Sequence, residues 1–109
     1  MGYQHSELAS GKWQTLTLAE QLGNIGSEVS RAKRWQGKDQ KSFKGAVDRA
    51  LELFDLTIAD LRWRKRLKEI VRAREVFCDA GEGGTEYNSS LEDLDRYFFY
   101  FALLARSRP

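Results

Sequence analysis

The residues best suited to chemistry in this chain are cations. Seven of the 18 Lys and Arg residues lie between Arg62 and Arg74, in the run RWRKRLKEIVRAR, together with one acid, Glu69. The rest of the chain has 11 basic residues against 15 acidic ones, so the net charge of +2 hides a basic segment in an otherwise acidic protein. Such a segment is typical of a surface that binds a polyanion or an acidic partner, and it is not a catalytic pattern.

We predict that this run contacts nucleic-acid phosphates, with strong salt dependence and little sequence selectivity. Six of its cations are the predicted nucleic-acid-binding residues: Arg62, Arg64, Lys65, Arg66, Lys68 and Arg72. On a continuous α-helix Arg64, Lys68 and Arg72 form one ridge, with Lys65 beside it. The other two cations lie on the opposite flank.

The last cation of the run, Arg74, falls inside the apolar stripe of its helix. A charged guanidinium in that position needs a partner, and Glu28, at the edge of the apolar stripe of the first helix, is a candidate. The alternative for the whole run is a solvated face paired to acids of other helices, such as Asp48, Glu52 and Asp55.

Metal chemistry has few candidate ligands. One His, His5, and one Cys, Cys78, cannot supply a zinc site or an internal disulfide framework. Any metal ion would have to be held by carboxylates.

Two acidic segments resemble the metal-binding pattern of the all-α nucleoside-triphosphate pyrophosphatases of the MazG type. In LAEQLGN, Glu20 matches the first acid of that family's first helix, while Gln21 and Asn24 replace the next two acids. Glu52 and Asp55 match the acids of its second helix. This resemblance implies a Mg²⁺-dependent pyrophosphatase, but the matching acids lie about 120–180° from the apolar stripes of their helices. We therefore keep it as an alternative and predict no catalysis, no metal ion and no cofactor.

The elements that must position these residues are helices. Thr17-Leu-Ala-Glu20 fits a capping box, and an apolar stripe predicts a helix from there to about Trp35. Residues 36–39, QGKD, predict a short turn with Gly37 as the C-cap.

A second apolar stripe extends from Phe43 to Ile58. The pattern permits either one long helix or two over residues 40–79. We predict a break near Thr57 to Asp60, with Asp60 as an N-cap, because a small domain cannot easily bury a helix of about 35 residues.

The basic run then lies on a third helix capped by Gly81, followed by a loop over residues 79–90. Ser89-Ser-Leu-Glu92 fits a second capping box, which predicts a last helix ending near Arg106.

The last helix carries five consecutive aromatic residues, Tyr97 to Phe101, which point in every direction around the helix. Phe98 belongs to the core stripe. The residues opposite it are the predicted oligomer interface: Phe99, Tyr100 and Leu103. The alternative is that neighbouring helices of the same chain cover them.

Small residues follow one face of the first helix: Ala19, Gly23, Gly26, Ser27 and Ser30. Glycine inside a helix is unfavourable by roughly 1 kcal/mol relative to Ala. The face therefore predicts the close approach of another helix, with room for a ligand as the alternative.

These elements predict one domain of the all-α class, an antiparallel four-helix bundle over residues 15–109 that forms a homo-oligomer. Residues 1–14 are predicted to be a flexible tail. The sequence has neither an apolar run of about 20 residues nor an apolar signal core, and with its single Cys this predicts a cytoplasmic protein without membrane contact.

The stretch from Leu18 to Ile58 resembles the core of the four-helix-bundle proteins encoded by 23S rRNA intervening sequences, and of their relatives, the accessory variability determinants of diversity-generating retroelements. The counterparts are Gln21, Glu28, Phe43, Ala50 and Glu52-Leu53. That family's Asn-Ile-Ala-Glu-Gly type of segment is replaced here by SEVSRAKRW. The resemblance implies no catalysis, homo-oligomeric assembly (pentamers are typical), and a basic surface that serves RNA, DNA or a reverse transcriptase. A protein-only oligomerisation module is the remaining alternative.

Overall fold

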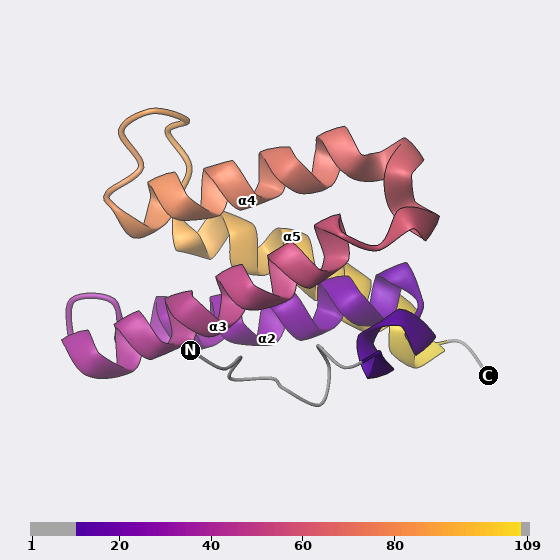
Figure 1. Cartoon of the computed structure of the whole chain (residues 1–109). Helices are drawn as coiled ribbons and strands as arrows, with labels where there is room; N and C mark the ends of the chain where they lie inside the picture. Colours follow the sequence, from indigo (N-terminus) through magenta and orange to yellow (C-terminus); the bar gives the residue numbers. More distant parts are fainter. Residues whose placement is uncertain (1–10, 108–109) are drawn as a thin grey trace.

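The computed structural model describes residues 11–107, and over that range the chain is all-helical, without strands. The elements are η1 (Lys12–Thr15), α2 (Leu18–Trp35), α3 (Gln40–Ile58), η2 (Leu61–Arg66), α4 (Leu67–Gly81) and α5 (Leu91–Ser107), where η marks a 3-10 helix. α2 packs against both α3 and α5, and α4 packs on α3 and α5 (Figure 1). The predicted all-α class with four α-helices is thus confirmed. None of the helices in this range is long and apolar enough to cross a membrane.

Side-chain caps set where two of the helices begin. Thr17 Oγ1 accepts the backbone N–H of Glu20 at 3.1 Å, and Glu20 Oε1 accepts the N–H of Thr17 at 2.8 Å, so the predicted capping box is confirmed. The capping box of α5 lies one residue later than predicted. Ser90 and Asp93 form it, through two reciprocal bonds of 3.1 Å, because the buried Leu91 is the first helical residue.

The break after the second predicted helix is also confirmed. α3 ends at Ile58, and the Asp60 side chain accepts the backbone N–H of Arg62 at 3.2 Å to cap η2. The basic run, however, is not one α-helix. Its first half is the 3-10 helix η2, in which Trp63 departs from helical geometry with φ −103° and ψ 16°. The predicted ridge of cations assumed 3.6 residues per turn throughout, so its geometry holds only from Leu67 onwards.

Aromatic side chains tie three of the helices together in the core. Phe54 of α3, Phe77 of α4 and Phe98 of α5 are each fully buried. The ring centroid of Phe54 lies 5.8 Å from that of Phe77 and 5.9 Å from that of Phe98. Aromatic pairs at these distances contribute beyond their buried area, so this cluster helps to fix α4 and α5 against α3.

The small-residue face of α2 lies against α5, as predicted. A Cβ added at Gly26 would lie 2.7 Å from the Cβ of Phe98, and one added at Gly23 would lie 3.3 Å from the Cα of Ala102. Only glycine permits this approach at Gly26, while a side chain at Gly23 would require α5 to shift by a few tenths of an ångström. The packing that the two glycines allow offsets their low helix propensity.

Part of the predicted flexible tail is helical. Trp13, in η1, is fully buried, and its Nε1 donates to Thr57 Oγ1 at 3.0 Å. For residues 11–14 the prediction is therefore wrong. A single 3-10 turn is too short to show a periodicity, and one large apolar residue suffices to anchor it. Residues 1–10 of that tail, with His5, lie outside the described residues, as do residues 108–109.

Candidate nucleic-acid interface

A buried hydrogen-bond network anchors the point where the basic run begins. Gln21 of α2 is fully buried. Its Nε2 donates to the carbonyl oxygen of Trp13 at 2.9 Å and to Asp60 Oδ2 at 3.0 Å. Its Oε1 accepts from Trp63 Nε1 at 3.0 Å. Both amide N–H donors of Gln21 are thus satisfied, and one side chain joins η1, α2, the α3–η2 turn and η2.

Asp60 is the charged member of this network. It is 5% exposed and accepts from Arg62 Nε at 3.0 Å and from Arg62 Nη2 at 2.6 Å. These side-chain hydrogen bonds are the main reason why the pKa of Asp60 falls to about 2, with smaller contributions from Gln21 and from the Arg62 backbone N–H. Burial acts in the opposite direction and is outweighed.

The main role of Arg62 is therefore to neutralise Asp60, and only part of its guanidinium is left to bind a ligand. Its Nη2 also donates to the carbonyl oxygen of Leu16 at 2.8 Å, and its guanidinium lies 4.4 Å from the ring centroid of Trp63. Of its three guanidinium nitrogens only Nη1 makes no hydrogen bond among the described residues. The prediction that Arg62 binds phosphate therefore applies to Nη1 alone.

Arg66 is also held by a carboxylate. Its Nε and Nη2 donate to Glu69 Oε1 at 3.1 and 2.8 Å, while Glu69 Oε2 accepts from the hydroxyl of Tyr97 at 2.9 Å. The hydrogen bonds from Arg66 lower the pKa of Glu69. Burial, and then the bond to Glu69, raise the pKa of Tyr97 to about 12. This chain of contacts links η2, α4 and α5 and leaves Nη1 of Arg66 unbonded within the described chain.

Arg72 stacks on an aromatic ring instead of pairing with an acid. Its guanidinium lies 4.7 Å from the ring centroid of Tyr87, whose hydroxyl donates to Glu75 Oε2 at 2.9 Å. An exposed cation–π contact of this kind contributes about 0.5–1 kcal/mol. Arg72 thus fastens the loop before α5 to α4.

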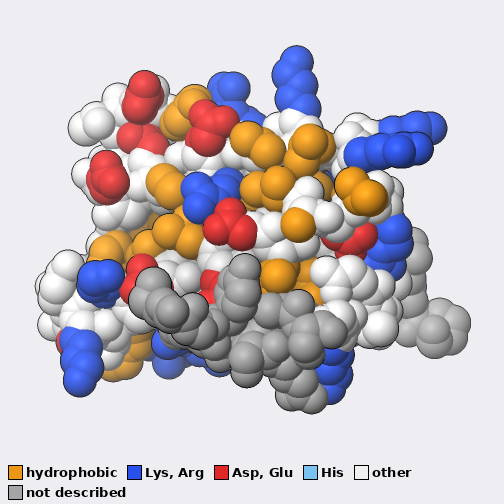
Figure 2. Space-filling view, viewed as in Figure 1, with side chains coloured by type: hydrophobic (Ala, Val, Ile, Leu, Met, Phe, Trp, Pro, Cys, Tyr) orange, Lys and Arg blue, Asp and Glu red, His pale blue; other side chains and the backbone are white. Residues whose placement is uncertain are grey.

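Three of the six predicted binding residues remain unengaged. Arg64, Lys65 and Lys68 are exposed, and in the described part of the chain none of them has an ion pair or a side-chain hydrogen bond. We call this surface the basic corner. Figure 2 shows Lys and Arg side chains gathered at the end of the molecule where η2 lies.

The seventh cation has a different partner from the one predicted. Arg74 Nε donates to Asp55 Oδ1 at 2.9 Å, and its side chain is 33% exposed. Glu28 is buried and instead pairs with Arg49 at 3.2 Å and Arg31 at 3.1 Å. The predicted Arg74–Glu28 pair is wrong because α4 packs on α3 and α5, which brings Arg74 to an acid of α3.

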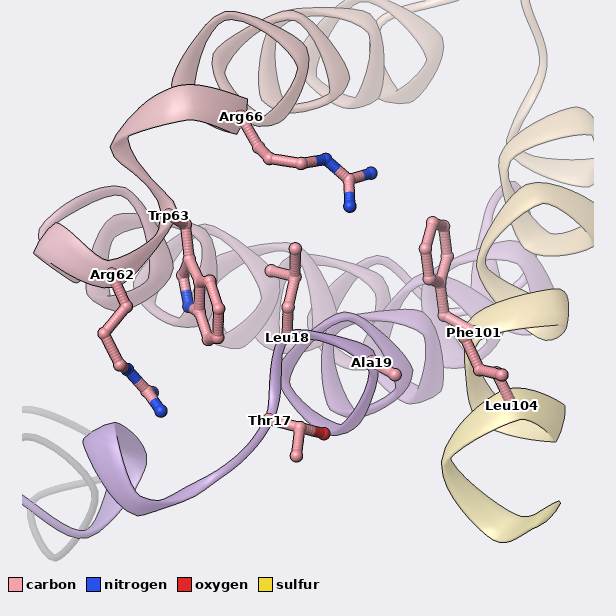
Figure 3. Close-up of a pocket in the computed structure, with 8 residues that line it drawn as sticks. All are labelled: Thr17, Leu18, Ala19, Arg62, Trp63, Arg66, Phe101 and Leu104. Carbon is pink, nitrogen blue, oxygen red and sulfur yellow. The ribbon is translucent and has the colours of Figure 1, made fainter. Parts of the chain in front are cut away.

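A groove lies beside the basic corner. Its volume is about 410 Å³, and its walls come from the start of α2, from η2 and from the second half of α5. Eight residues line it: Thr17, Leu18, Ala19, Arg62, Trp63, Arg66, Phe101 and Leu104. In Figure 3 Arg66 extends over the groove from η2, facing Phe101 on the opposite wall. We call it the Trp63 groove.

The sequence did not indicate the Trp63 groove, because Leu18 and Phe101 fit the apolar stripes of the first and last helices as core residues do. Both are partly buried and pack at the edge of the core. The signal that could have found it is the triplet Arg62-Trp63-Arg64, in which a large aromatic residue lies between cations.

A second group of unengaged cations was also missed. Arg34, Lys38 and Lys41 surround the turn between α2 and α3, and they too are exposed without an ion pair among the described residues. The run RAKRWQGKDQK carried this signal. These three cations match the basic corner in composition, with one Arg and two Lys, but none of them lines the Trp63 groove.

The acids of the pyrophosphatase alternative are not brought together. Glu20 is held in the capping box of α2, and Asp55 is paired with Arg74. Within residues 11–107, no group of three or more His, Cys, Asp or Glu side chains could hold a metal ion. The single thiol is not activated either, since burial is the main cause that raises the pKa of Cys78.

The predicted interface residues of α5 lie on its outer surface. Phe99 is 53% exposed, Tyr100 70% and Leu103 43%, and the neighbouring Leu104 is also 43% exposed. The alternative that other helices of the same chain cover them is wrong for the described chain. The result is a continuous exposed apolar face on one helix.

Fold and site together define a small all-α protein with an anchored basic corner beside an apolar groove. Comparisons of the chain with protein-family models, with curated proteins and with solved structures found no match. The family resemblances drawn from the sequence therefore stay predictions.

Proposed function

We propose that this protein is a non-catalytic binding module that contacts nucleic acid, or a nucleic-acid enzyme bound to it, through the basic corner. The observation that carries the proposal is the set of three exposed cations, Arg64, Lys65 and Lys68, without a carboxylate partner in the described chain. A cation that is already paired with a carboxylate must give up that ion pair when it binds a phosphate. An unpaired cation breaks no ion pair, and the release of counterions on binding is the main source of affinity for a polyanion.

The anchoring of the corner supports the same proposal. A run of seven cations repels itself, and a flexible run would lose conformational entropy on binding. Here Asp60 and Glu69 neutralise Arg62 and Arg66 at short distance, and Gln21 fixes the turn before them. The remaining cations are thus presented from a backbone that is already ordered.

We further propose that the four helices run antiparallel and that the protein self-associates through the outer face of α5. Phe99, Tyr100 and Leu103 are exposed, and an apolar face of this kind on a small domain is typical of a protein–protein interface. Assembly would repeat the basic corner once in each subunit. This face also favours a second candidate function, an oligomerisation module that binds no nucleic acid.

The test compares two triple variants with the same loss of charge. The first, Arg64→Gln with Lys65→Gln and Lys68→Gln, removes the basic corner. The second, Arg34→Gln with Lys38→Gln and Lys41→Gln, removes the cations of the α2–α3 turn. Binding to a fluorescent oligonucleotide is measured by anisotropy over a series of salt concentrations.

We expect the first variant to bind at least tenfold more weakly and to lower the slope of log affinity against log salt by about 2–3 per chain, which corresponds to about three lost phosphate contacts. The second variant should lose much less, because its cations lie at the other end of the molecule from η2 (Figure 1) and act through general charge alone. Equal losses in both variants would show that net charge, and not the basic corner, attracts nucleic acid. Absence of binding by the unaltered protein would leave the oligomerisation module as the better explanation.

Self-association has its own test in Phe99→Glu combined with Leu103→Glu. Both side chains are exposed in the single chain, so the substitutions should leave the helical circular dichroism unchanged. Sedimentation should show an oligomer for the unaltered protein and a monomer for the variant. A monomer in both cases would refute assembly through α5.

A further inference from the structure

We infer that the Trp63 groove admits one unpaired nucleobase, so that the surface prefers single-stranded over double-stranded nucleic acid. This inference rests on the proposed function and names the class of nucleic acid that it would bind. A base in a duplex is paired and stacked between its neighbours, and it cannot enter a groove of about 410 Å³ between helices unless it leaves the stack.

The walls of the groove suit the flat face of a base. Leu18, Ala19 and Leu104 supply aliphatic surface, while Trp63 and Phe101 supply aromatic surface (Figure 3). Bases of single-stranded nucleic acid stack on such side chains with little regard to sequence, because every base has an apolar face. Stacking of this kind fits a surface whose cations contact the phosphate backbone and which makes no sequence-specific contacts to base edges.

Two arginines of η2, Arg62 and Arg66, line the groove, and their guanidinium groups lie on either side of Trp63 (Figure 3). Each is held by a carboxylate through its Nε and Nη2. The Nη1 of each guanidinium has no hydrogen bond among the described residues, so each has two N–H donors left for a phosphate oxygen. Because Asp60 and Glu69 already fix the guanidinium planes, little side-chain entropy is lost when a phosphate binds.

The basic corner lies between and just after these two arginines in the chain. Arg64 and Lys65 belong to η2 between the two groove arginines, and Lys68 follows in the first turn of α4. A single strand with one base in the groove would therefore have its adjacent phosphates close to η2. A peptide with an apolar side chain beside an acid would meet the same groove but would use the unpaired cations less fully, which makes it the less favoured occupant.

The test uses two single-stranded ligands of equal length and charge, an oligothymidylate of about 15 nucleotides and a fully abasic strand with the same backbone. Both offer the same phosphates to the basic corner, and only the first offers bases to the groove. We expect the oligothymidylate to bind about tenfold more tightly, the amount typical of one stacked base. A duplex of the same length should bind no more tightly than the abasic strand.

Two single substitutions locate the preference. Leu104→Glu puts a carboxylate in the groove, on the α5 wall that faces Arg66, and should remove the preference for bases. Leu61→Glu adds the same charge at a residue that is 78% exposed, next to the basic corner but not in the groove lining. Leu61→Glu, the control, should lower the affinity for both ligands by the same factor, so that the ratio of the two affinities stays unchanged. Both replaced side chains are exposed enough for the fold to persist.

Tryptophan fluorescence gives a second readout. Trp13 is fully buried, whereas Trp35 and Trp63 are partly exposed, so a Trp35→Phe variant leaves Trp63 as the accessible indole among the described residues. The oligothymidylate should quench its emission, and the abasic strand should not.

The outcomes separate this inference from the proposed function. Equal affinity for both strands would overturn base insertion and leave phosphate contact by the basic corner intact. If neither strand binds, the inference is overturned, and if the duplex does not bind either, the proposed function is overturned as well. The last outcome comes from a competition experiment with labelled oligothymidylate. If an acidic, apolar peptide displaces it at a lower concentration than unlabelled oligothymidylate does, the groove belongs to a protein partner and the inference is overturned.

Discussion

The anchoring of the basic run makes a quantitative prediction about Asp60. Asp60→Asn keeps the size of the side chain and removes its charge, which leaves Arg62 without its counterion. It also places an amide N–H₂ where a carboxylate now accepts from Gln21 and from Arg62. Hydrogen bonds to charged groups contribute about 1.5–3 kcal/mol each, and not additively, so we expect Asp60→Asn to lower the free energy of unfolding by about 2–4 kcal/mol at pH 7.

The pH dependence of that loss follows from the pKa of Asp60. The pKa falls from its ordinary value of 3.8 in the unfolded chain to about 2 in the folded protein. A tenfold change in proton affinity corresponds to about 1.4 kcal/mol, so the ionised carboxylate favours the folded state by about 2 kcal/mol. Because the folded pKa is the lower one, this contribution is complete above the unfolded pKa. It is lost as the pH falls from about 4 towards 2.

The assay is urea unfolding followed by circular dichroism, on the unaltered protein and on Asp60→Asn, at several pH values between 6 and 2. The difference in unfolding free energy between the two proteins should shrink by about 1 kcal/mol at pH 3 and by about 2 kcal/mol at pH 2. Other acids titrate in both proteins and largely cancel in this difference. A difference that stays constant over this range would refute the claim that ionised Asp60 holds the corner.

A surface substitution provides the control for Asp60→Asn. Asp48 forms an exposed i,i+4 pair with Lys44 at 3.2 Å on α3. Asp48→Asn should change the free energy of unfolding at pH 7 by no more than about 0.5 kcal/mol. A loss as large as that of Asp60→Asn would mean that general electrostatics, and not the buried network, accounts for the effect.

Two further predictions test the packing around α5. Gly26→Ala should destabilise the protein by about 1–2 kcal/mol in the same urea assay, because the new Cβ would lie 2.7 Å from that of Phe98. Gly45→Ala should be neutral or stabilising by up to about 1 kcal/mol, because the new Cβ would meet only the guanidinium end of the Arg49 side chain, at 3.3 Å. In a spectrophotometric titration one tyrosine should ionise near pH 12, and Tyr97→Phe should remove that step. Because the pKa of Tyr97 is higher in the folded protein than in the unfolded chain, the unaltered protein should lose stability as the pH rises from about 10 to 12. Tyr97→Phe should lose less stability over this range. A titration that Tyr97→Phe leaves unchanged would contradict the assignment of this pKa to Tyr97.

The helices were predictable from the sequence because local patterns determine them. The capping box at Thr17 and Glu20 fixes the start of α2 by hydrogen bonds within four residues. Asp60 likewise marks the break after α3 through a bond to the backbone two residues later. Even the misplaced capping box of α5 is off by only one residue, because both Ser89 and Ser90 are followed by an acid at the required spacing.

The partners of the charged residues were not predictable in this way. Gln21 contacts Trp13, Asp60 and Trp63, which lie 8, 39 and 42 residues away in the chain. Angular reasoning on an ideal α-helix paired Arg74 with Glu28, because it could not include the 3-10 segment that precedes α4 or the packing of α4 on α3. The predicted binding residues therefore included Arg62 and Arg66, whose main contacts are internal ion pairs.

The internal pairs change how a basic run of this kind should be interpreted. Charge alone groups all seven cations together, but the structure separates those that hold the backbone from those that are exposed without a partner. Asp60 and Glu69 each take one arginine of η2, and this permits Arg64, Lys65 and Lys68 to stay unpaired on an ordered segment. Loss of either acid should therefore weaken ligand binding although it makes the protein more basic. A surface attraction that depended on net charge alone would be strengthened by the same substitution.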